Sequence, residues 1–376
     1  MRAVILYAKL APFHKARLAT AARLFAARSD SLACIEIAAA QSSYRWDTGP
    51  NQAANYTSQT LFEDSDYADI GTLDLWGRLH QSLADLQPDV VVVNGWGFRE
   101  SWMSVRMLLR SGQGVVVVSD SHLEDHPRWW FPEGVKRWFL RCCHAAFVAG
   151  APQQRYLEAL GFSQDSCFSG CDVVDNALFA EGPPVIFPAE PTELKLISCI
   201  RLLPHKNLVG AAQALAKAKV PWRWTIAGEG PERDVLMQEI AQLGLGDRIQ
   251  LVGRLDYPDL AAFHRTGHIY LQPSLSEPWG LAVNEAMASG LPVLVSKQCG
   301  CHEDLVHDGA NGYSFDAADP NQLVLGVHTL WEKRGEWDEM GAASRRIIAP
   351  WSLDLFAENL HAACVMAMAK SHARRA

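Results

Sequence analysis

The feature that most constrains the fold of this sequence is an alternation of short apolar runs with longer segments of helical period. Apolar runs occupy residues 3–7, 32–38, 89–93, 115–118 and 145–148, and segments of helical period include 16–28, 101–110 and 135–142. Strands in which nearly every side chain is apolar are buried on both faces of a sheet. Their alternation with helices is typical of parallel βαβ units. The sequence therefore predicts an α/β protein with doubly wound parallel sheets.

A proline-rich break divides the chain into two such series. Residues 181–193 contain four prolines, which exclude a continuous helix or a central strand. A second series of strands and helices begins at residue 194, and 376 residues exceed one ordinary core. We expect a Rossmann-like domain at 1–180, a linker at 181–193 and a second Rossmann-like domain at 194–351. Ligands of such sheets lie beyond the carboxyl ends of the strands, so we expect the two sheets to face a central cleft.

Charge and hydropathy exclude several classes of partner. The formal net charge is −8 and the sequence pI is about 5.9, values that argue against a protein whose surface binds nucleic acid. No stretch offers the roughly 18 uninterrupted apolar residues of a membrane-spanning helix. The apolar run at residues 1–11 lacks the pattern of a secretory signal, and it is expected to form the first strand. We therefore expect a cytoplasmic protein.

The cysteines do not predict a disulfide framework or a metal centre. Nine cysteines are scattered through apolar surroundings, an odd number without regular spacing. The segment Cys299-Gly300-Cys301-His302 could supply metal ligands, but a single short cluster without a second pair at zinc spacing is weak evidence. We expect no metal.

The most informative segment for function is 274–293, where a strand ends and a helix begins. Glu277 lies in the connecting loop, Pro278 and Gly280 introduce the helix, and the helix ends before Pro292. The amides of Gly280 and Leu281, together with the helix dipole, favour an anion such as a diphosphate. Glu285 lies about one turn further, where a carboxylate can accept both hydroxyls of a ribose. The sequence therefore predicts a nucleotide site at the start of this helix.

Two glutamates eight positions apart around such a helix resemble the E-x7-E motif of retaining glycosyltransferases of the GT-B fold, family 4 (glycosyl transferases group 1). The resemblance covers most of the second half of the chain. Further segments occur in the order of that family, namely Arg201 to Asn207 as R-x4-K-N, Gly228 to Pro231 as G-x-G-P, and residues 252–254, 272–274 and 308–312.

The resemblance implies a role for each matching residue. Arg201 and Lys206 would bind the donor diphosphate and stabilise its growing charge. Glu277 would hold the sugar hydroxyls and Glu285 the ribose. The Gly253-Arg254 loop would contact the base through its backbone, and Gly228 would allow close approach of the nucleotide. The implied reaction moves a sugar from a nucleoside diphosphate sugar, with UDP favoured, to a carbohydrate or lipid-linked acceptor, in the synthesis of a glycolipid, polysaccharide or glycoconjugate, without a metal or other cofactor. A final helix at 352–370 would return to the first domain.

Each motif alone has a simpler explanation. An isolated Arg-x4-Lys is often a solvated helix start, and carboxylates near a helix N-terminus are favourable without any ligand. A catalytically inactive nucleotide-sugar binding protein, a nucleotide-sugar epimerase or a phosphorolytic enzyme on the same fold are the alternatives. The presence of all four charged motif residues argues against an inactive protein, whereas the lack of glycine in the loop after the first strand argues for one. The four residues are Arg201, Lys206, Glu277 and Glu285.

That first loop, residues 9–15, contains none of the glycines that the family usually carries there. His14 or Lys15 could substitute through a side chain, or the loop could be simple surface. Asp120 and His122, which follow the strand at 115–118, are candidates to face the sugar, although a loop histidine is often only solvated. Residues 41–69 show no clear period and are expected to form an irregular excursion.

Aromatic and cationic residues alternate at 129–141, beginning with Trp129-Trp130-Phe131 and continuing through Lys136, Arg137 and Arg141. One interpretation is an interfacial patch for peripheral membrane contact with a lipid-linked acceptor. The other is a buried aromatic cluster beneath a basic helix face.

Overall fold

The computed structural model describes residues 1–40, 56–108, 112–125 and 129–373. Its contacts divide the chain into two compact units. The first comprises 1–120, 128–173 and 353–376, and the second comprises 121–127 and 174–352. The predicted α/β class is confirmed in both units, since each contains one sheet in which every strand pairs in parallel.

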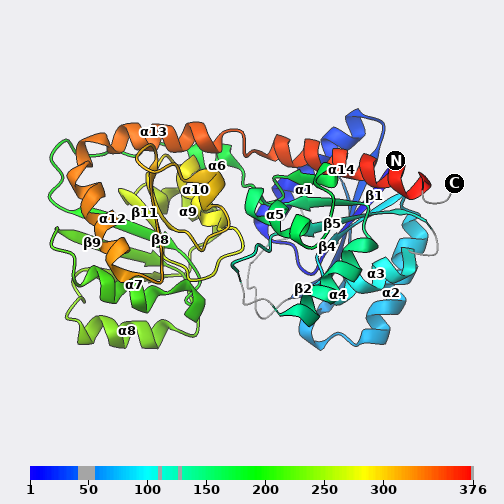
Figure 1. Ribbon diagram of the computed structural model, residues 1–376, viewed down its shortest axis with the longest axis horizontal. Helices are drawn as coiled ribbons and strands as arrows, with labels where there is room; N and C mark the ends of the chain where they lie inside the picture. The colour runs from blue at the N-terminus through cyan, green and yellow to red at the C-terminus, as the bar shows by residue number, and fades with distance from the viewer. Residues whose placement is uncertain (41–55, 109–111, 126–128, 374–376) are drawn as a thin grey trace. The chain divides into compact units, whose positions relative to one another are not determined.

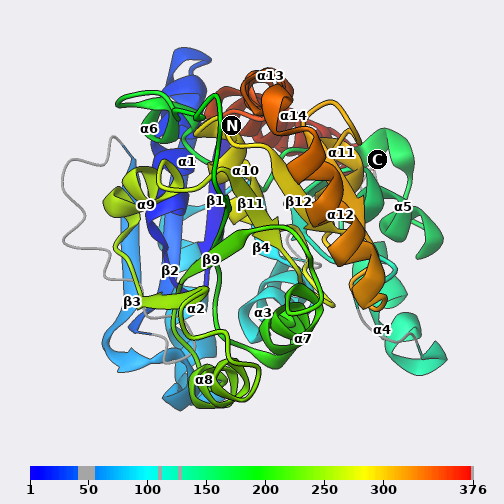
Figure 2. The same cartoon turned by 90° about the vertical axis from the view of Figure 1, so that its left-hand side faces the viewer.

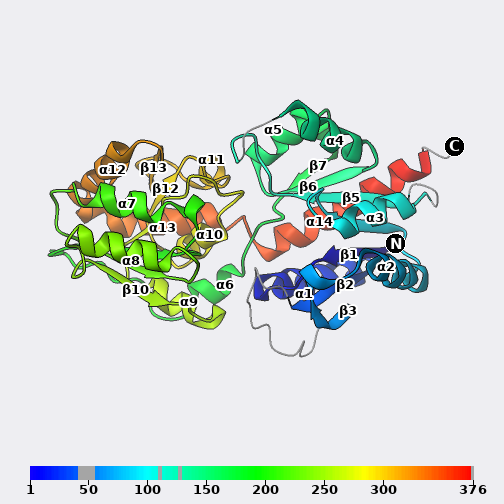
Figure 3. The same cartoon turned by 90° about the horizontal axis from the view of Figure 1, so that it is seen from below.

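The first unit is a seven-stranded sheet with the order β3-β2-β1-β4-β5-β6-β7. Figure 3 shows β3, β2 and β1 followed by β5, β6 and β7 across the unit. Its strands are β1 Arg2–Tyr7, β2 Ser31–Ala40, β3 Thr57–Asp66, β4 Val90–Asn94, β5 Gly114–Ser119, β6 Ala145–Val148 and β7 Cys167–Ser169. Its helices are α1 Pro12–Ala27, α2 Thr72–Leu86, α3 Arg99–Leu108, α4 Trp130–Arg141, α5 Ala151–Ala159 and α14 Leu353–Ala373, with single turns at Tyr67–Asp69 and Gln164–Ser166.

Helices cover both faces of the first sheet, as apolar strands require. α1 and α14 pack against each other on one face, and α14 contacts β4 to β7. α2 and α3 lie on the other face (Figure 1). The four valines of β4 and Val115 to Val117 of β5 are almost fully buried between these layers. The continuous apolar runs therefore form the centre of the sheet.

Two local expectations in this unit were wrong. Residues 57–66 form strand β3, which pairs in parallel with β2, although they were expected to be irregular. Most of this strand is exposed or half-buried at the sheet edge, so its Ser, Thr and Gln side chains carry no apolar pattern. Residues 41–55 of the expected excursion lie outside the described residues. α1 begins at Pro12 rather than at residue 16, because proline suits the first helical position.

The second unit is a six-stranded sheet with the order β10-β9-β8-β11-β12-β13. Its strands are β8 Leu194–Cys199, β9 Trp222–Ala227, β10 Ile249–Gly253, β11 Ile269–Gln272, β12 Val293–Ser296 and β13 Gly312–Phe315. Its helices are α6 Asn176–Ala180, α7 Leu208–Leu215, α8 Arg233–Gln242, α9 Tyr257–His264, α10 Leu281–Ala288, α11 His302–Leu305, α12 Pro320–Glu332 and α13 Trp337–Ile348, with single turns at Pro204–Lys206 and Arg334–Glu336.

The core of the second unit also lies between helices and both faces of its sheet. α7 packs against α8 and α12, whereas α10 packs against α6, α9 and α13. Figure 2 shows β11 and β12 side by side, in the register that pairs Tyr270 with Val293. Trp222, Trp224 and Trp337 are among the largest fully buried side chains. Because the strands are parallel, the carboxyl ends of β8 to β12 lie next to one another at one edge of this sheet.

The residue boundaries of the two units differ from those of the predicted domains. The chain passes to the second unit after Val173 rather than after residue 180, because α6 packs on α9 and α10. Residues 121–127 group with the second unit, although they follow β5 of the first. Helix α14 belongs to the first unit by its contacts with α1 and β5. The cleft between two facing sheets stays a prediction.

Candidate active site

Most of the predicted donor-binding residues lie at one edge of the second sheet. Arg201 follows β8, Gly228 follows β9, Gly253 ends β10 and Glu277 follows β11. These four strands are neighbours in the sheet and run in parallel. Their carboxyl ends therefore meet at the same edge, which is where open α/β sheets bind ligands.

Lys206 is placed by the loop after β8. The loop turns at Asn207, which has a left-handed φ of 58° and donates from Nδ2 to the Pro273 carbonyl at 3.2 Å. The amide of Leu275 donates to the His205 carbonyl at 2.8 Å. These bonds join the β8 loop to the β11 loop and hold the Lys206 side chain, which is only 6% exposed. Lys206 Nζ pairs with Glu277 Oε2.

Glu277 is fixed by its backbone as well as by this ion pair. Its amide donates to the Gln298 carbonyl at 3.2 Å, and its carbonyl accepts from the Gly300 amide at 2.9 Å, so the loop adds a short parallel bridge beside β12. Gln272 Nε2 donates to Glu277 Oε2 at 3.0 Å. Among the described residues, Glu277 Oε1 accepts no hydrogen bond. One carboxylate oxygen is held, and the other remains for a ligand.

The helix that follows begins as the sequence predicts. Gly280 has a φ of 109°, a conformation that glycine adopts without strain, and Leu281 is the first residue of α10. The N-terminus of α10 lies at the carboxyl edge of β11, so its first amides are available at the same edge as Lys206. Amides and a helix dipole at this place favour a diphosphate.

Glu285 is buried in α10, with 5% of its surface exposed. Burial without a cationic partner raises its pKa from 4.5 to about 8. The carboxyl is therefore largely protonated at neutral pH in the free protein. A buried polar group of this kind is suited to hydrogen bonds with hydroxyls that enter from the ligand side.

Gly228 and Gly253 bring two loops into direct contact. The Gly228 amide donates to the Gly253 carbonyl at 2.7 Å. A Cβ at Gly228, where φ is 150°, would lie 1.9 Å from the Ile200 carbonyl oxygen, so no larger residue fits. Arg254 is exposed, and its Nη2 lies 4.0 Å from Asp256 Oδ1.

The two candidates after β5 separate in the structure. His122 is 4% exposed, and its Nε2 lies 3.2 Å from the Glu277 carbonyl oxygen, so it belongs to the donor loop. Asp120 is exposed just after β5 in the first unit, where its charge adds to the burial and the Asp172 charge that raise the pKa of the Cys171 thiol. His14 accepts from the Ala11 amide at 3.0 Å, so its Nδ1 serves the local helix start.

Sequence reasoning missed the supporting roles of two residues, Asp125 and Gln272. Asp125 accepts from the His122 amide at 3.2 Å through Oδ2, and its carbonyl accepts from Ser276 Oγ at 2.8 Å. Gln272 was recognised only as part of a motif. Asp125 lies three residues after His122, a spacing at which an Asp side chain often accepts a hydrogen bond from the backbone of a turn. This spacing was the signal in the sequence that could have identified Asp125.

The cysteine segment after β12 supports the Glu277 loop. Cys299 and Cys301 are buried, and burial raises the pKa of both thiols well above its usual range. Within residues that the structure describes, no three His, Cys, Asp or Glu side chains gather to hold a metal ion.

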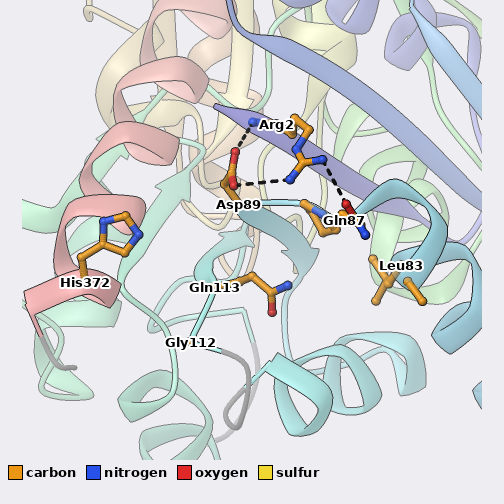
Figure 4. A pocket seen from close by; sticks show the side chains of 9 residues that line it. Arg2, Leu83, Gln87, Asp89, Gly112, Gln113 and His372 are labelled. Carbon is orange, nitrogen blue, oxygen red and sulfur yellow. Dashed lines mark hydrogen bonds and ion pairs between the residues drawn. The ribbon is translucent and has the colours of Figure 1, made fainter.

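A pocket of about 370 Å³ lies elsewhere, at the amino edge of the first sheet. Arg2, Asp89 and Gln113 line it where β1, β4 and β5 begin. Figure 4 shows Arg2 directed at both Gln87 and Asp89. None of the sequence-predicted residues lines this pocket, and it is at the opposite edge from the ligand side of a parallel sheet.

Comparison with known proteins matches the second unit to a family. Residues 185–347 match the model of the family described as Glycosyl transferases group 1. The chain is 34% identical over 131 residues to the UDP-N-acetylglucosamine–peptide N-acetylglucosaminyltransferase GtfA subunit of Streptococcus gordonii, covering 34% of this chain and 25% of the relative. It is 31% identical over 141 residues to the phosphatidylinositol N-acetylglucosaminyltransferase gpi3 subunit of Schizosaccharomyces pombe, covering 35% of this chain and 30% of that protein.

The match to solved structures covers the fold as a whole. The crystal structure of Anabaena HepE in complex with UDP aligns with a TM-score of 0.71 at 16% identity, covering 96% of this chain and 99% of that chain. The aligned parts of the two curated relatives amount to less than a third of their lengths. The family model and the structural match agree with the motifs at the carboxyl edge of the second sheet. Residues 185–347 therefore match the glycosyl transferases group 1 family, and the chain has the GT-B fold.

Proposed function

We propose that the protein is a retaining glycosyltransferase that moves a sugar from a UDP-sugar to an acceptor hydroxyl. The observation that carries this proposal is the pair of Lys206 and Glu277 beside the N-terminus of α10. A cation and helix amides would bind the diphosphate, and the carboxylate beside them would bind the sugar. Glu285 would accept hydrogen bonds from the ribose hydroxyls when it is ionised, and could donate one to them when it is protonated.

In the proposed reaction, the bond between the anomeric carbon and the β-phosphate oxygen breaks. Arg201 and Lys206 stabilise the charge that develops on the leaving diphosphate. The acceptor oxygen bonds to the anomeric carbon on the face that the diphosphate leaves, and a diphosphate oxygen takes the acceptor proton. Glu277 Oε2 is already occupied by Lys206 and Gln272, which favours a binding role over nucleophilic attack.

The choice of UDP and the absence of a metal requirement are part of the proposal. A relative is named for a UDP-sugar and a structural neighbour was solved with UDP, which supports uridine here. Two cationic side chains at the expected diphosphate position supply charge that a metal supplies elsewhere. We expect that EDTA leaves turnover unchanged and that added Mg²⁺ does not raise it.

Thermal stabilisation by UDP, GDP and ADP tests the donor site. We expect UDP to raise the melting temperature of the wild type, and Lys206→Ala to abolish the rise because the diphosphate loses its buried cation. Lys333→Ala is the matched control, since Lys333 also pairs with a glutamate but lies in an exposed turn. If no nucleotide at millimolar concentration stabilises the wild type, the proposal fails.

Turnover separates the proposed enzyme from its alternatives. Incubation with a UDP-sugar and an acceptor gives a glycosylated product and UDP for a transferase. A binding protein without activity gives neither, an epimerase gives a different UDP-sugar, and a phosphorolytic enzyme requires inorganic phosphate. Nuclear magnetic resonance of the product reports whether the anomeric configuration is retained.

For the acceptor, we propose a lipid-linked carbohydrate presented at a membrane that α4 contacts. Trp129, Trp130 and Phe131 are 71%, 85% and 66% exposed at the start of α4, and Arg137 is exposed on the same helix. Exposed aromatics with neighbouring cations suit an anionic lipid interface. No helix in the described part of the chain has the length and hydropathy to cross a bilayer.

The inner face of α4 fixes the helix to the first unit. Trp138 stacks on Trp102 with ring centroids 5.8 Å apart, and Lys136 donates to Glu133 and Tyr156. Phe139 and Leu140 are the buried residues of α4, whereas Trp138 is 52% exposed, so the alternative of a buried aromatic cluster fits Phe139 and not residues 129–131.

Vesicle sedimentation tests the membrane contact. Wild type should sediment with vesicles of phosphatidylcholine and phosphatidylglycerol, and a variant with Trp129, Trp130 and Phe131 changed to alanine should lose most of this binding. Leu73→Ala is the control, because Leu73 is an equally exposed apolar residue on α2. Equal sedimentation of both variants would contradict the proposal.

A further inference from the structure

Gln272 is the last residue of β11, and its side-chain amide is fully engaged inside the second unit. Nε2 donates to Ser274 Oγ at 3.0 Å and to Glu277 Oε2 at 3.0 Å. Oε1 accepts from the Tyr270 hydroxyl at 2.8 Å. Gln272 is only 2% exposed and Tyr270 is fully buried, so neither is available to contact bulk solvent.

The orientation of this amide is determined by its neighbours. If the amide were reversed, Gln272 Oε1 would face Glu277 Oε2. Both oxygens accept hydrogen bonds and neither can donate one, so this orientation is unfavourable. On the other side, the Tyr270 hydroxyl, whose pKa burial raises well above its usual range, lies 2.8 Å from Gln272 Oε1 and 3.3 Å from the Cys199 carbonyl oxygen, and the shorter contact supports the same orientation. The amide therefore presents an N–H to Glu277.

We infer that Gln272 is a positioning residue that determines which oxygen of Glu277 meets the donor sugar. Nε2 of Gln272 and Nζ of Lys206 both bind Oε2, and this leaves Oε1 for the sugar hydroxyls. Tyr270 acts behind Gln272 by holding the amide in this orientation. The inference rests on the proposed function, and it goes beyond it by assigning recognition of the sugar, rather than of the nucleotide, to a residue that does not contact the donor.

The test compares the affinities for UDP and for a UDP-sugar in wild type, Gln272→Leu and Tyr270→Phe. UDP-glucose, UDP-galactose and UDP-N-acetylglucosamine are titrated first, and the sugar nucleotide that the wild type turns over is kept. For Gln272→Leu we expect UDP affinity within about twofold of wild type, and a fall of about tenfold in the ratio of UDP-sugar to UDP affinity, the usual effect of losing a hydrogen bond to a charged group. The kcat should fall more than KM rises.

Tyr270→Phe should change the ratio in the same direction by about threefold, since the amide remains but loses one partner. Gln213→Leu is the matched control, because Gln213 also donates to a carboxylate, Glu239, but at an exposed position. It should leave both affinities unchanged.

The outcomes distinguish the two proposals. Equal losses of UDP and UDP-sugar affinity in Gln272→Leu indicate a merely structural role and overturn the inference, as does an unchanged ratio. In either case, binding of UDP by the wild type leaves the proposed function in place. A wild type that binds no uridine nucleotide overturns the proposed function and the inference together.

Discussion

The loops at the carboxyl edges of the two sheets differ in the residues that shape them. In the second unit, positive-φ glycines such as Gly228 and Gly280 turn the loops, and short-range bonds link each loop to the next. In the first unit, the loop after β1 contains no glycine, and His14 there serves the start of α1. Positive-φ glycines also follow β4 and β7 of the first unit, so the contrast lies in the loop after β1. The difference teaches that a loop at this edge can be shaped by a glycine turn or by a side chain that accepts a backbone hydrogen bond.

The largest effect is expected at the ion pair in the second unit. Lys206→Ala should lower kcat by about 10²- to 10³-fold, because it removes a buried cation from the developing charge and leaves Glu277 without its cationic partner. Steady-state turnover of the UDP-sugar measures it. The first unit provides the contrast in Lys136→Ala, which also breaks a Lys–Glu pair and should lower turnover far less. Similar losses in both variants would erase the contrast between the units.

A second effect concerns the stability of the two edges. Gly228→Ala should lower the free energy of unfolding by about 3 kcal/mol, since its Cβ would meet the Ile200 backbone. Gly170→Ala in the first unit also has a positive φ, but its Cβ would meet the mobile end of Leu355, and a loss of about 1 kcal/mol is expected. Urea unfolding of both variants decides the order, and a larger loss for Gly170 would reverse the comparison.

A third effect depends on pH. Because folding raises the pKa of Glu285 from 4.5 to about 8, its contribution to stability is complete below about pH 4.5 and is lost as the pH rises through about 8. Between pH 5 and pH 9, wild type should lose on the order of a few kcal/mol that Glu285→Gln retains. In the first unit, burial also raises the pKa of Glu100, but Tyr67 donates to it and opposes the shift. Glu100→Gln should therefore change the pH dependence less.

The smallest effect is expected at the segment that follows β5. His122→Ala should lower kcat by about threefold to tenfold with UDP affinity unchanged, because it removes a hydrogen bond to the Glu277 backbone and no contact to a nucleotide. His80→Ala, at an exposed position on α2, is the control. A loss of UDP affinity in His122→Ala would show that this segment shapes the nucleotide site itself.

The sequence was most informative where one residue type was required by geometry. Continuous valine runs predicted the central strands, and Gly280 with Pro278 predicted the start of α10, because burial and a left-handed turn allow few alternatives. β3 was missed, since an edge strand with polar side chains lacks a period. Gln272 was missed as a functional residue for another reason: its role comes from contacts with Tyr270 and Glu277, which depend on how a strand end faces the next loop.

The first unit is discontinuous in sequence, and this has a consequence for synthesis. Residues 174–352 leave the ribosome as a complete second unit while α14 is still to be made. Until then, the face of β4 to β7 that α14 covers lacks the apolar side chains of Phe356, Leu360 and Cys364, which are buried in the finished protein. Domains usually fold in the order of their synthesis. Here we expect the reverse, with the second unit finished first and the nascent first sheet dependent on chaperones until the last helix arrives.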